Sequence, residues 1–75
     1  MKELLEFIAK SLVDYPDDVV VTENIDGTSV LLTLHVNESD MGKVIGKQGR
    51  IAKSIRLVIK ACASREYKKV VVEFA

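Results

Sequence analysis

Apolar residues recur at helical spacing over residues 2–13, and this pattern predicts an amphipathic helix at the start of the chain. Its apolar stripe consists of Leu4, Leu5, Ile8 and Leu12. Acidic side chains in the first turn suit the positive end of the helix dipole. The helix is expected to end at Tyr15-Pro16, because the residue before a proline is pushed out of the helical region.

Two strands are predicted next, roughly over residues 19–25 and 29–36. Both runs are rich in Val, Ile, Leu and Thr, and Asp26-Gly27 between them is typical of a hairpin, because the tight turn needs a positive φ. In the second strand apolar and mixed positions alternate, so one of its faces is expected to lie in the core. That face carries Val30, Leu32, Leu34 and Val36.

Two further helices and a last strand complete the pattern. A short helix, about 41–45, follows a loop whose Ser39 or Asp40 is expected to cap it. Gly46–Gly49 then separates it from a longer helix, about 50–65, and a strand follows at about 68–74. The order α-β-β-α-α-β predicts an α+β fold in one domain, residues 1–75, with three helices on one face of a three-stranded sheet. The pattern leaves the strand order open.

The long helix has an apolar and a basic side. The residues expected to face the sheet are Ile51, Ile55, Val58, Ile59 and Cys62. Cys62 is therefore expected to be a buried, inert thiol. Leu57 falls among the basic residues, next to Ala61 in helical projection. Two interpretations of Leu57 stay open, an isolated exposed leucine that needs no partner or, with Ala61, a self-association patch.

The formal charge of zero conceals a strong segregation. Residues 1–40 hold nine acidic and two basic side chains, whereas residues 41–65 hold seven basic side chains and no acidic one. Such a segment is either a solvated helix face or a cationic surface for a polyanion.

The loop from Gly46 to Gly49 lies inside this acid-free segment and begins the long helix. Glycine lets a ligand's backbone approach closely, and the first amides of a helix favour an anion. Lys47 adds a phosphate-seeking charge and Gln48 a neutral donor and acceptor. The pattern G-x-x-G alone is weak evidence for a binding loop, but its place between two helices strengthens that interpretation.

The run Val44–Ala52, with aliphatic residues on both sides of the loop, resembles the KH family, whose G-x-x-G loop clamps about four nucleotides of RNA backbone. A helix and a strand before the core unit, and one strand after it, resemble the type II KH fold. Over essentially its whole length the chain looks closest to the small stand-alone bacterial KhpA/YlqC family. This resemblance implies cytoplasmic binding of single-stranded RNA with broad specificity, self-association, and pairing with a larger Jag-type KH protein.

From the loop and the basic helix face we predict the RNA-binding residues. They are Lys43, Ile45, Gly46, Lys47, Gln48, Gly49, Arg50, Lys53 and Arg56. Lys60 extends the basic track, and a groove beside the loop is expected to be floored by Val44, Ile45, Ile51 and Ile55. The function expected is a broad-specificity RNA chaperone, acting as a homodimer or with a larger KH-containing partner. The alternative is a protein–protein adaptor whose RNA binding is incidental.

Other chemistries find little support. The run Gly42–Gln48 is one residue short for a P-loop and has Gln48 where magnesium requires Ser or Thr. A single histidine, His35, and a single cysteine, with no converging acids, predict no catalytic residue, no metal site and no cofactor. The chain has no apolar run long enough for a bilayer and no basic-then-apolar leader at its start, so we expect no membrane partner and a protein that stays where it is made.

Overall fold

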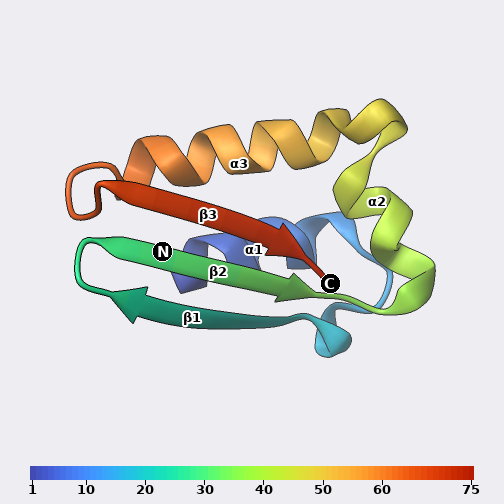
Figure 1. Ribbon diagram of the computed structural model, residues 1–75. Coiled ribbons are helices and arrows are strands. Elements are labelled where there is room, and N and C mark those ends of the chain that lie inside the picture. Colours follow the sequence, from blue (N-terminus) through green and yellow to red (C-terminus); the bar gives the residue numbers. More distant parts are fainter.

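The computed structural model describes all 75 residues and forms two layers, a sheet and the helices that cover one of its faces (Figure 1). The helices and strands are α1 (Lys2–Leu12), β1 (Val20–Asp26), β2 (Ser29–His35), α2 (Met41–Ile45), α3 (Arg50–Ala63) and β3 (Lys69–Phe74). Short 3₁₀ turns lie at Pro16–Asp18, Glu38–Asp40 and Lys47–Gly49. The predicted fold class is confirmed, and each predicted element is present within about two residues of its expected bounds. None of the helices combines the length and the hydropathy that a bilayer span requires.

The strand order, which the sequence pattern left open, is β1-β2-β3. β1 and β2 are antiparallel, with Asp26 opposite Ser29, so the hairpin turn consists of Gly27 and Thr28 rather than Asp26 and Gly27. β2 and β3 are parallel, with Val30 opposite Val70. A parallel pair cannot be joined by a tight turn, so the chain crosses over through α2 and α3. This crossover carries the Gly46–Gly49 loop.

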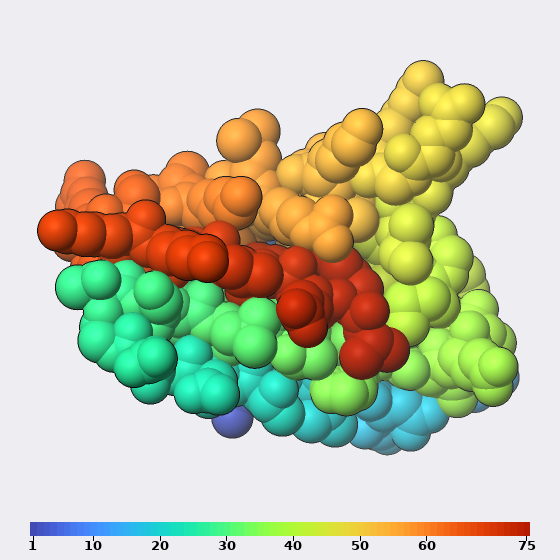
Figure 2. Space-filling view, viewed as in Figure 1, coloured from blue at the N-terminus to red at the C-terminus, as the bar shows by residue number.

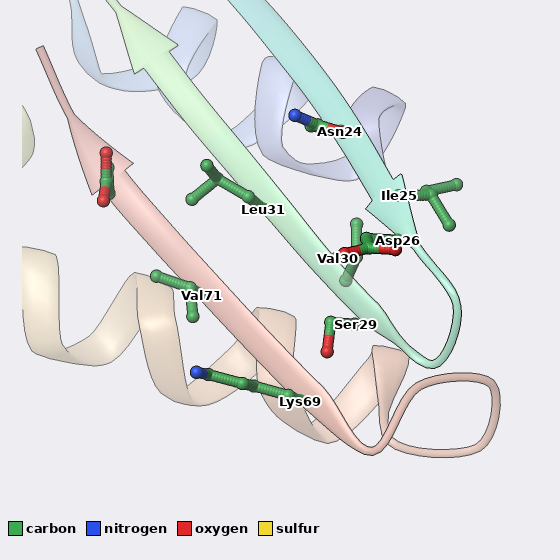
Figure 3. A pocket seen from close by; sticks show the side chains of 9 residues that line it. Asn24, Ile25, Asp26, Ser29, Val30, Leu31, Lys69 and Val71 are labelled. Atoms are coloured by element: carbon green, nitrogen blue, oxygen red, sulfur yellow. The ribbon is translucent and has the colours of Figure 1, made fainter.

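The core lies between the sheet and the helices. The alternation expected in β2 is confirmed, because Val30, Leu32 and Leu34 are buried while His35 is exposed. The rest of the core cluster is contributed by Leu5, Ala9, Val19, Val21, Val44, Ile55, Ile59, Ala63, Val70 and Val72. The face of the sheet away from the helices is open, and it bears a shallow depression between Asn24 and Lys69 with Leu31 and Val71 at its centre (Figure 3).

The expected burial of Val58 and Cys62 is wrong. The buried residues of α3 are Ala52, Ile55, Ile59 and Ala63. Two of these four residues are alanines, which the pattern of larger apolar side chains leaves out, so the buried stripe is rotated away from the predicted one. Val58 is 46% exposed and Cys62 carries an exposed free thiol.

Candidate nucleic-acid interface

The loop between α2 and α3 reverses the chain through left-handed backbone conformations. Gly46 has φ 75° and ψ 176°, a region that essentially only glycine occupies. Gln48 (φ 59°, ψ 24°) and Gly49 (φ 74°, ψ 15°) are both in the left-handed helical region. The Gly46 N–H donates to Gly42 O at 2.8 Å, and Gly49 N–H donates to Gly46 O at 3.2 Å. These bonds make the loop a defined turn that projects, with the start of α3, from the body of the molecule (Figure 2).

Gly46 is also required by packing. A Cβ atom at this position would lie 2.6 Å from Ile51 Cγ1 and 2.9 Å from Ile51 Cβ, distances that atoms in proteins do not adopt. At Gly49 a Cβ atom would meet nothing within 4 Å. Gly46 is therefore required for the close packing of α2 against α3, whereas Gly49 is favoured only because its φ is positive.

The loop and the first turns of α3 gather several free cations. Lys47, Arg50 and Lys53 have exposed side chains, and none of their charged groups takes part in an ion pair or a hydrogen bond within the chain. The neutral side chain of Gln48 is exposed beside them. Lys60 is exposed further along α3. With no carboxylate among them, Lys47, Arg50 and Lys53 form a surface of uncompensated positive charge at the positive end of the α3 dipole.

Arg56 was predicted on the same track but faces the sheet. Its Nε donates to Val72 O at 3.1 Å, and its guanidinium carbon lies 5.0 Å from the centre of the Phe74 ring. Val72 is in β3, the edge strand beside α3. The rotation of α3 that exposes Val58 brings Arg56 onto β3, so this cation is held by the fold while its neighbours on α3 extend into solvent.

Lys43 is likewise engaged within the chain. Its ammonium forms an ion pair with Asp14, and it lies 3.4 Å from Asp40 Oδ1. The hydrogen bond to Asp14 raises the pKa of Lys43, and Asp40 adds to this effect, although partial desolvation opposes it. Lys43 is thus separate from the free cations at the loop.

The sequence predicted that Ser39 or Asp40 caps α2. Asp40 stands directly before α2 but makes no side-chain capping hydrogen bond to it. Asn37 caps the 3₁₀ turn instead, since its side-chain Oδ1 accepts the Ser39 N–H at 2.9 Å. Asp40 is completely buried and accepts the backbone N–H groups of Asp14 (3.2 Å) and Tyr15 (3.0 Å). These partners lie 26 and 25 residues away in sequence, so no local pattern indicates them.

The pKa of Asp40 follows from this arrangement. Burial opposes ionisation, but the N–H donors of Asp14 and Tyr15, together with the Lys43 ammonium, outweigh it and hold the pKa of the carboxyl below its ordinary value of 3.8.

The apolar floor expected beside the loop is narrower than predicted. Val44 is fully buried and Ile55 nearly so, and both belong to the core. Ile45 and Ile51 are partly buried and flank the loop on either side. They are the aliphatic surface that remains accessible beside Gly46–Gly49.

An α-β-β-α-α-β chain whose exposed G-x-x-G loop joins two helices defines a KH-type domain. The family model described as "KhpA/KhpB, KH domain" matches residues 2–74. The chain belongs to this family.

Relatives with high identity support the assignment. RNA-binding protein KhpA of Clostridium perfringens is 66% identical over 73 residues, which cover 97% of each chain. RNA-binding protein KhpA of Listeria monocytogenes is 51% identical over 73 residues, covering 97% of this chain and 96% of the relative. A crystal structure of Era in complex with MgGDPNP and nucleotides 1506–1542 of 16S ribosomal RNA matches 99% of this chain and 30% of Era, with a TM-score of 0.60 and 19% identity. At that identity the likeness shows the fold alone.

The two glycines of the loop should respond differently to alanine. Gly49→Ala is expected to cost about 1 kcal/mol of unfolding free energy, the usual penalty of a left-handed non-glycine residue. Gly46→Ala should cost about 3 kcal/mol or more, because an unfavourable backbone region and the contact with Ile51 act together. Urea unfolding followed by circular dichroism measures both. Equal losses would show that the Ile51 contact does not constrain the loop.

Asp40 should contribute to stability in a pH-dependent way. Its pKa is lower in the folded chain than in the unfolded one, so its contribution is present above pH 3.8 and is lost as the pH falls through the folded pKa below that value. Asp40→Asn should therefore be less stable than the parent at pH 7, with the difference narrowing in acid. Thermal melts between pH 7 and pH 2.5 test this. Asp17→Asn, at an exposed carboxylate, serves as the control and should track the parent throughout.

Proposed function

We propose that this protein binds single-stranded RNA in the cytoplasm through the Gly46–Gly49 loop, with broad base specificity. The observation that carries the proposal is the cluster of exposed, unpaired cations around a loop with no side chain at two of its four positions. Lys47 and Gln48 contact phosphates, Gly46 and Gly49 let the RNA backbone approach, and Arg50 and Lys53 continue the contact along α3. The relatives named RNA-binding protein KhpA support the same function.

Broad specificity follows from what surrounds the loop. The accessible apolar surface is aliphatic, from Ile45 and Ile51, and the aromatic residues are few and scattered. Aliphatic side chains accept any base face, whereas the stacking platforms of other RNA-binding folds use aromatic rings. An RNA chaperone needs contacts of this tolerant kind.

Replacing Lys47 and Gln48 together by Asp should abolish RNA binding while the protein stays folded, because Asp tolerates the left-handed conformation of position 48. Filter binding of a labelled single-stranded RNA measures the loss. For the parent, about four phosphate contacts give a fall in log K of about 3 per decade of salt. Ser64→Asp with Lys68→Asp makes the same change of charge beyond the far end of α3 and should retain most of the affinity. Undiminished binding by a folded Lys47→Asp/Gln48→Asp variant would contradict the proposal.

A second function, self-association, has an observation of its own. Leu57, Val58, Ala61 and Cys62 are all exposed on α3, and Leu57 is 72% exposed. They form an apolar strip beside the basic residues, which supports a homodimer, or a pairing with a Jag-type KH protein, more than an isolated leucine would. An adaptor whose RNA binding is incidental would use this strip and have no need of Lys47 between two glycines.

Leu57→Asp should lower the sedimentation mass of the protein if the strip joins two copies, because it places a carboxylate in the centre of an apolar contact. Phe7→Asp changes an equally exposed apolar residue on α1 and should leave the mass unchanged. A Leu57→Asp variant with the parent's dimeric mass would exclude the strip as the interface.

A further inference from the structure

The orientation of the loop depends on α2, and this short helix depends on tertiary contacts for its stability. α2 spans only Met41–Ile45, and a helix of that length is unstable in water without tertiary contacts. Gly46 follows it directly, so any tilt of α2 moves the loop. Val44 anchors one side of α2 in the core.

The other anchor is a polar cluster that we call the Asp40 clamp, comprising Asp14, Tyr15, Asp40 and Lys43. The buried carboxylate of Asp40 accepts two backbone N–H groups from the segment after α1 and lies against the Lys43 ammonium. Lys43, from the middle of α2, also pairs with the Asp14 side chain. The clamp therefore connects α2 to the segment after α1 through the one buried carboxylate of Asp40.

We infer that Asp40 and Lys43 are positioning residues that fix α2, and with it the Gly46–Gly49 loop, and that Lys43 is not among the phosphate-binding cations. The inference deepens the proposed RNA binding and rests on it. It separates Lys43 from Lys47, two lysines four positions apart that the sequence pattern treats alike.

Electrostatics separates the two lysines. Lys43 faces two carboxylates, so the formal charge of Asp14, Asp40 and Lys43 together is negative. A phosphate that recruited Lys43 would take it from Asp40 and leave a buried carboxylate with one fewer partner, which is costly. Lys47 has no carboxylate partner and can bind a phosphate with no such loss.

The salt dependence of RNA binding distinguishes the two roles. Each phosphate contact with single-stranded RNA contributes about 0.7 to the slope of log K against log salt. Lys47→Met should reduce the slope by about that amount. Lys43→Met, the same substitution on the other side of Gly46, should lower affinity several-fold at every salt concentration with the slope unchanged. Lys43→Arg keeps the cation and should restore affinity. A slope reduced equally by both Met variants would overturn the inference.

Amide hydrogen exchange tests the clamp without RNA. Asp40→Asn should accelerate exchange at Tyr15 and in the Gly46–Gly49 loop, while β2 and the middle of α3 exchange as in the parent. Unchanged loop exchange would overturn the inference even if affinity falls.

The two proposals fail in different ways. A parent protein that binds no RNA at low salt removes the proposed function, and the exchange experiment still reports on the clamp. A parent that binds RNA, combined with a Lys43→Met variant of reduced slope, removes the clamp's role and leaves RNA binding intact.

Discussion

The packing of Ile51 against the bare Cα of Gly46 is the contact on which the rest of the site depends. It brings the first turn of α3 close to the end of α2, and this closeness forces the chain through a tight turn with three residues at positive φ. This tight loop exposes Lys47 and Gln48 and leaves the start of α3 open to solvent. One missing methyl group thus determines the shape of the proposed RNA-binding surface.

The cations that appear equivalent along the chain divide into two groups in space. Lys43 and Arg56 have partners, the first among carboxylates and the second on β3. Lys47, Arg50 and Lys53 have none within the chain. Because a pairing within the fold has to be given up before a ligand can bind, the second group is the one suited to a polyanion. Charge along the sequence marks the region, and geometry selects the residues within it.

The fold class, the element order and the loop were predictable, because each has a local cause. The alternation of β2, the hairpin turn and the glycines at 46 and 49 all act over a few residues. The errors have non-local causes. Cys62 and Val58 are exposed because α3 buries Ala52 and Ala63 in their place, and the role of Asp40 depends on N–H groups from a segment 25 and 26 residues earlier. The strand order also has a non-local cause, because β3 pairs with β2 only after the chain has crossed over through α2 and α3.

The hydrogen bond from Arg56 to Val72 O also has a consequence for the open edge of the sheet. β3 is an edge strand, and an open edge offers its carbonyl and N–H groups to a strand of another molecule. Arg56 occupies one of these carbonyls and places a charge beside the ring of Phe74. A second strand could join β3 there only by displacing a charged hydrogen bond. The same side chain that the sequence places on an RNA track therefore hinders strand addition at β3, one of the two edges of the sheet.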